Sequence, residues 1–191
     1  MYALLRPDPE HLRRYIARES VRPVFDSPAV LPDPPPRGYH PNRAEIELGS
    51  GKEVFEAARS ALGEWRQFPE AWAMLEPPRL PIAVGGTVAV VVRYFGVWVV
   101  TCCQITHVFD TERHFGFIYA TTAGHPLAGA ELFEVVWGAD DRVVYRLHSY
   151  SITRQLTARL ARGFVRGLQR RFALDSPAAM LAAVRSTCGA D

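Results

Sequence analysis

Residues 87–109 read TVAVVVRYFGVWVVTCCQITHVF and carry the strongest indication of the fold. An apolar run that overlaps these residues extends over 82–105 and is long enough to span a bilayer. However, the run is rich in valine, carries Arg93 near its centre and is interrupted by Gly96. Valine-rich segments bounded by glycine are typical of buried strands. We therefore expect two strands that meet at Gly96, and no transmembrane segment.

Alternation of apolar and polar residues continues on both sides of this stretch. The predicted strands are 44–48, 87–95, 97–109, 115–122, 131–137 and 142–152. Helices are predicted where apolar residues recur every three or four positions. They lie within 1–21, from a capping box at Ser50 and Glu53 to about Trp65, and at 69–75, 153–172 and 178–184.

A run of strands kept apart from helices is typical of α+β folds. The long helix of twenty residues and a nine-residue strand both span about 30 Å, so this helix can lie along the whole sheet. We predict a curved antiparallel sheet of about six to seven strands that grips a long C-terminal helix. This order of elements is similar to the helix-grip fold of START domains and the birch-pollen allergen. Residues 1–42 are predicted to be a short helix and a proline-rich lead-in, and 43–191 a single domain.

Composition excludes several classes of protein. With 48% apolar and 22% charged residues, the chain of 191 residues is not a disordered protein. Its net charge of +2 is too small to indicate a nucleic-acid partner. The first five residues are too short an apolar stretch for a signal peptide, and three cysteines suit a reducing compartment. We therefore expect a cytoplasmic protein.

Metal and cofactor motifs are missing from the sequence. None of the six histidines has the spacing of a zinc-binding motif, so we expect no metal. The glycines at 49 and 51 do not match a phosphate-binding loop, and we expect no cofactor.

The densest group of polar residues lies in two predicted strands within 115–134. Phe117, Tyr119 and Thr121 share one face of the first strand, and Glu131 and Phe133 share one face of the second. If these strands form a hairpin, Glu131 lies close to Tyr119 or Thr121.

His125 lies in the loop that joins these strands. An imidazole, the Glu131 carboxylate and the Tyr119 phenol around a cavity mouth can transfer protons or orient a ligand. These three are the candidate catalytic residues. In the alternative interpretation Glu131 caps loop amides and His125 packs a tight turn. No nucleophile motif and no second, paired carboxylate accompany them, which favours a protein without enzymatic activity.

Arg93 is the one cation inside a strongly apolar predicted strand. Our hypothesis is that it lies on a cavity wall, where it needs a carboxylate partner such as Glu131 or Glu134.

The segment 116–133 resembles the central signature of the DUF1990 family, a domain of unknown function. The matching residues are Gly116, Phe117, Tyr119, Thr121, Gly124, His125, Pro126, Gly129, Glu131 and Phe133. Further matches are Gly38-Tyr39, Gly49-Ser50-Gly51, Trp65 and Gln169, so the resemblance covers about 37–175. Ala130 departs from the family, which usually has a glutamate there, and Ser151-Ile152-Thr153 stands where it has Ser-Arg-Pro. The resemblance implies a compact α+β domain of the helix-grip type and supplies no activity.

Three hypotheses about function follow. The first is a protein that binds a small hydrophobic or amphipathic molecule between the sheet and the last helix. The second is a hydrolase or cyclase that uses Glu131, His125 and Tyr119. The third is an interaction module that uses the proline-rich segment and the arginine face of the last helix, which is formed by Arg159, Arg162, Arg166 and Arg170. The residues assigned to ligand binding are Phe117, Tyr119, Thr121, His125, Glu131, Phe133 and Arg93.

Overall fold

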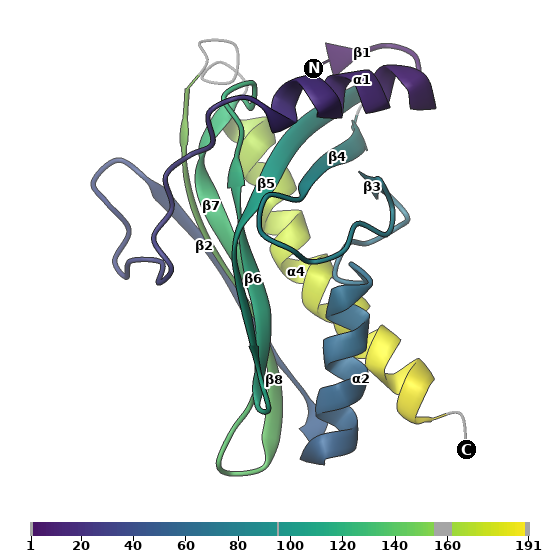
Figure 1. Ribbon diagram of the computed structural model, residues 1–191, viewed down its shortest axis with the longest axis vertical. Helices are drawn as coiled ribbons and strands as arrows, with labels where there is room; N and C mark the ends of the chain where they lie inside the picture. Colours follow the sequence, from purple (N-terminus) through teal and green to yellow (C-terminus); the bar gives the residue numbers. More distant parts are fainter. Residues whose placement is uncertain (1, 95, 155–161, 190–191) are drawn as a thin grey trace.

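The computed structural model describes residues 2–94, 96–154 and 162–189. Its centre is an eight-stranded antiparallel sheet in the order β2-β8-β7-β6-β5-β4-β3, with the short β1 paired to β5. The strands are β1 (Tyr2–Ala3), β2 (His40–Ser50), β3 (Ala73–Glu76), β4 (Thr87–Tyr94), β5 (Val97–Thr111), β6 (His114–Thr121), β7 (Leu127–Trp137) and β8 (Arg142–Thr153). Figure 1 shows the sheet bending around α4 (Arg162–Cys188), with α2 (Gly51–Gly63) beside that helix. The predicted helix-grip fold is confirmed.

The valine-rich stretch forms two strands, as predicted. β4 ends at Tyr94 and β5 begins at Val97, and the two pair antiparallel. Side chains alternate between the faces of the sheet, so the neighbours Cys102 and Cys103 belong to separate apolar clusters on opposite sides. Among the described helices, none is both long and apolar enough to cross a membrane.

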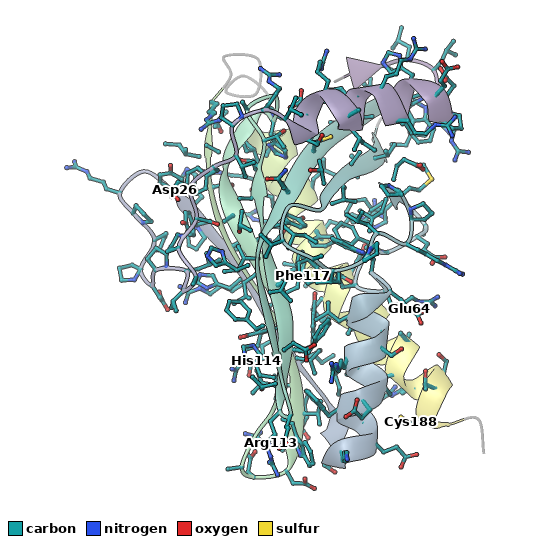
Figure 2. All side chains as sticks on the ribbon, in the orientation of Figure 1. Asp26, Glu64, Arg113, His114, Phe117 and Cys188 are labelled. Carbon is teal, nitrogen blue, oxygen red and sulfur yellow. The ribbon has the colours of Figure 1, made fainter. Side chains whose placement is uncertain are left out.

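The main core lies between the sheet and the helices α2 and α4. Phe55, Phe117 and Phe133 are fully buried there, and the Trp65 and Phe117 ring centroids lie 4.9 Å apart in an edge-on contact. In Figure 2 the Phe117 side chain points from the sheet toward the helices, whereas His114 lies on the outer side. The aromatic side chains on the inner face of β6 and β7 therefore belong to the main core.

The N-terminal segment covers the outer face of the sheet. Helix α1 (Pro9–Ser20) starts where the Asp8 carboxylate accepts a hydrogen bond from the His11 amide at 2.9 Å. Its Leu12 and Tyr15 pack on β4 and β5 from outside. The proline-rich connector then lays Leu31, which is 5% exposed, against the outer face of β6 and β7.

The predicted helix at 69–75 is wrong. A turn over 70–72 leads instead into the edge strand β3, whose Ala73 pairs with Val92 of β4. Pairing with the open edge of β4 outweighs a local helical pattern that is too short to be stable alone. The capping box at Ser50 is also wrong in part, because Ser50 is the N-cap of α2 but its side chain makes no capping hydrogen bond.

The C-terminal helix differs from the prediction at its second half. The break expected between residues 172 and 178 is absent, and α4 continues through Pro177 to Cys188. Packing explains the continuity: the Ser176 hydroxyl lies 2.8 Å from that of Tyr145, and Met180 and Val184 are buried in the core. Thr153, the predicted helix start, is the last residue of β8, and 155–161 lie outside the described residues.

Candidate functional site

A row of polar side chains crosses the inner face of the sheet. Tyr119 of β6 pairs with Glu131 of β7, Glu131 with Ser149 of β8, and Ser149 with Asn42 of β2. Residues paired across neighbouring strands point to the same face. All four side chains therefore face the space beneath α4, and the predicted approach of Glu131 to Tyr119 is confirmed.

This row forms one wall of a cavity of about 230 Å³ between the sheet and α4. The opposing walls are largely apolar and include Phe68, Trp72, Val90, Val92, Leu168 and Phe172. A dry cavity of about 150 Å³ is large enough to bind benzene. The cavity therefore has room for a molecule with one or two rings.

Glu131 is the acidic group of this wall. The Tyr119 hydroxyl donates a hydrogen bond of 2.7 Å to Glu131 Oε2, and the Ser149 hydroxyl donates a second. Burial disfavours the charged form and raises the pKa of Glu131 from 4.5 to about 7, although both hydrogen bonds act in the opposite direction. Burial and the neighbouring carboxylate also raise the pKa of Tyr119 well above its usual value. The hydrogen-bonded pair therefore loses one proton, that of Glu131, as the pH rises through neutrality.

His125 lines the same cavity from the loop between β6 and β7. Its Nδ1 lies 2.9 Å from the Leu127 amide nitrogen and 3.2 Å from the Leu127 carbonyl oxygen, so the backbone of Leu127 fixes the position of the ring. Burial lowers the pKa of His125 from 6.5 to about 4, so the ring is neutral at pH 7. Among the hydrogen bonds of the described residues, none joins His125 to Glu131 or Tyr119. The three candidate catalytic residues thus share one cavity, but only Tyr119 and Glu131 are in contact.

A buried carboxylate from the outer helix holds the His125 loop. Glu19 of α1 is fully buried and accepts hydrogen bonds from the Thr122 hydroxyl at 2.8 Å and the Gly124 amide at 3.1 Å. Burial raises the pKa of Glu19, but hydrogen bonds from Thr122 and Arg22 outweigh it, and the net shift is downward. A Cβ on Gly124 would collide with this carboxylate. Sequence reasoning missed Glu19 because it lies 103 residues from its Thr122 partner.

Helix α4 adds further polar groups that sequence reasoning missed. The Gln169 side-chain amide donates to the Ser151 hydroxyl at 3.0 Å, and the Asn42 side-chain amide donates to the backbone carbonyl of Gln169 at 3.0 Å. Alternation along β8 could have placed Ser149 and Ser151 on the face of Leu147. No local signal marks Asn42, because its place follows from the pairing of β2 with β8.

Three of the residues assigned to ligand binding lie elsewhere. Phe117 and Phe133 share the face of Tyr119 and Glu131, but they are fully buried in the core and do not line the cavity. Arg93 is exposed and its guanidinium lies 5.7 Å from the Trp98 ring centroid. Because Val92 points into the cavity, alternation turns Arg93 to the opposite face of β4, and the hypothesis that it faces the cavity is wrong.

Thr121 does line the cavity, and its hydroxyl accepts a hydrogen bond from the Gly129 amide at 3.2 Å. In the part of the chain that the structure describes, no three histidine, cysteine or acidic side chains converge closely enough to hold a metal ion.

Two bacterial proteins of solved structure have a similar fold. A hypothetical protein from Helicobacter pylori superimposes with a TM-score of 0.57 at 10% identity, covering 84% of this chain and 99% of that one. The Zhui aromatase/cyclase from Streptomyces sp. R1128 gives a TM-score of 0.52 at 17% identity, covering 78% and 96%. At these identities the similarity shows a shared fold alone.

Relatives by sequence are closer. A UPF0548 protein of Dictyostelium discoideum is 31% identical over 166 residues, which cover 81% of this chain and 77% of that protein. A UPF0548 protein of Arabidopsis thaliana is 30% identical over 156 residues, which cover 78% and 76%. Residues 26–179 match the model of a family described as a domain of unknown function, DUF1990. The resemblance carried by 116–133 is therefore confirmed, and the chain belongs to the DUF1990 family.

Proposed function

We propose that the protein binds a small, largely apolar molecule in the cavity between the sheet and α4. The observation that carries this proposal is an ionisable carboxyl, Glu131, on the wall of an otherwise mainly apolar cavity. Burying such a group destabilises a fold, and an apolar side chain at 131 would fill a plain core better. A polar anchor in an apolar cavity is the usual composition of a ligand site.

The other two hypotheses gain less from the structure. Catalysis by the three candidate residues requires hydrogen-bond reach between base and partner, which only Tyr119 and Glu131 have. An interaction module built on the proline-rich segment would leave that segment free. Instead, Phe25 lies 6.0 Å from the Tyr150 ring and Leu31 is buried on the sheet.

Filling the cavity is expected to abolish binding. Val92 lines the cavity and pairs with Ala73 and Val99, which also line it, so Val92→Phe places a ring in the ligand space. We expect this variant to bind 2-naphthylmethanol, a neutral two-ring probe, at least about tenfold more weakly than the parent chain. Isothermal titration calorimetry measures the affinities, and thermal unfolding verifies that the variant is folded.

Arg93→Phe is the matched control, because it adds the same ring one residue further along, on the outer face. Its affinity should equal that of the parent. Equal binding by both variants, or equal loss in both, would place the probe outside the cavity and contradict the proposal.

A further inference from the structure

We propose that the molecule bound in this cavity carries a protonated amine, and that Glu131 binds it as a carboxylate. This inference rests on the proposed function, and it specifies the charge of the ligand and the chemical group at its polar end. The cavity has an acidic group on one wall, aromatic rings on the opposing walls, and space for one or two rings between them.

The described cavity wall holds one acidic side chain and neither lysine nor arginine. His125 is neutral at pH 7, because burial lowers the pKa of its imidazole to about 4. The other titratable groups near Glu131 are Cys103 of β5, Tyr119 of β6 and Tyr145 of β8, and burial raises the pKa of each. Helix α4 and strand β2 contribute uncharged polar groups there, Gln169 and Asn42. An ionised Glu131 is therefore a negative charge without a counter-ion on the described wall.

The hydrogen bonds around Glu131 favour a carboxylate over a neutral acid. Both Tyr119 and Ser149 donate to it, and donors stabilise the ionised form. Only the loss of water around the group opposes ionisation. A ligand ammonium would replace that lost solvation, because a desolvated cation–carboxylate hydrogen bond is among the strongest that proteins form.

The opposing walls suit the same ligand. Phe68 and Phe172 have ring centroids 5.0 Å apart, and both line the cavity together with Trp72. The Trp72 indole donates to the Asp175 carboxylate at 2.8 Å, which fixes the orientation of its ring. Aromatic faces attract cations and also pack against an apolar ring. An aromatic or cyclic body with an aminomethyl group therefore matches both walls.

Three probes with the same body and different charge test the inference. They are 2-naphthylmethylamine, 2-naphthylmethanol and 2-naphthoate, titrated into the full chain at pH 8 by calorimetry. We expect the amine to bind about tenfold tighter than the alcohol, and the carboxylate to bind most weakly. The affinity for the amine should rise from pH 6 to pH 8 as Glu131 ionises, because an alkyl amine stays protonated over this range. The affinity for the alcohol should stay constant.

Glu131→Gln removes the charge and keeps the shape of the side chain. It should reduce the preference for the amine to about twofold and retain binding of the alcohol. Glu134→Gln is the control, since it makes the same charge change on the same strand but at the outer face, where Glu134 contacts His114. That variant should keep the preference.

The outcomes separate this inference from the proposed function. Equal binding of amine and alcohol, or tighter binding of the carboxylate, would overturn the amine inference and leave a neutral or acidic ligand in the same cavity. A preference for the amine that persists in Glu131→Gln would also overturn it. Failure of all three probes to bind the folded chain would count against the cavity itself.

Discussion

Replacing Gly129 with alanine is expected to lower the free energy of unfolding by about 4 kcal/mol or more, the largest effect of any single methyl group in the cavity wall. A Cβ at this position would collide with the Tyr150 carbonyl oxygen and lie 2.8 Å from the Ser151 Cα. Both are backbone atoms of the neighbouring strand, so β7 and β8 must separate to make room. Urea denaturation followed by circular dichroism measures the change.

Two other glycines provide graded controls for this prediction. Gly63→Ala meets no atom within 4 Å and should be neutral or slightly stabilising. In Gly124→Ala the atoms nearest to the new methyl group belong to the carboxylate of Glu19, which is a side chain and not backbone, so this variant should fall between the two. Equal stability of the three variants would show that β7 and β8 are not in this close contact.

Glu131→Gln is expected to stabilise the protein at alkaline pH. The Glu131 carboxyl ionises near pH 4.5 when unfolded and near pH 7 when folded. Between these values the folded chain keeps a proton that the unfolded chain has lost, so the contribution of Glu131 to stability falls as pH rises from 4.5 to 7. Glutamine does not titrate. The variant should match the parent below pH 4.5 and exceed it by up to about 3 kcal/mol at pH 8.

Tyr119→Phe should strengthen the pH dependence of stability that Glu131→Gln removes. The variant lacks the hydroxyl that donates to the Glu131 carboxylate, so the pKa of Glu131 in the folded chain should rise further. The parent's loss of stability between pH 5 and pH 8 should become larger in this variant. Stability curves for Glu131→Gln and the parent that stay parallel across this range would contradict a buried, titrating Glu131.

Patterns within one strand or hairpin were sufficient to predict much of the fold. The interruption at Gly96 indicated that β4 and β5 are separate, and alternation placed Tyr119 and Glu131 on facing positions. These features depend on residues that are neighbours in sequence or joined by a short loop, so a local rule describes them.

The predictions failed where a distant segment decides the outcome. Residues 69–75 have helical spacing, but the free edge of β4 pairs with Ala73 and its neighbours. Pro177 would end an isolated helix, but burial of Met180 keeps α4 continuous. The apolar residues around Arg93 in the sequence led to the prediction that it faces the cavity. Its neighbour Val92 faces the cavity instead, so alternation along β4 directs Arg93 to the outer face.

The sequence was sufficient to predict one wall of the candidate site, but not the other. Glu131, Tyr119, Thr121 and His125 were found because they are close together in the chain and chemically distinctive. The opposite wall was not found: Trp72, Leu168 and Phe172 look like ordinary core residues whether they fill a core or face a cavity. Their role follows only from how α4 lies across the sheet.

Native mass spectrometry of the protein purified from its own host shows whether a small molecule occupies the cavity. We expect a stoichiometric small molecule on the parent chain and on Arg93→Phe, released on denaturation and absent from Val92→Phe. A parent chain at its bare mass, or an adduct that Val92→Phe retains in full, would contradict a ligand site between the sheet and α4.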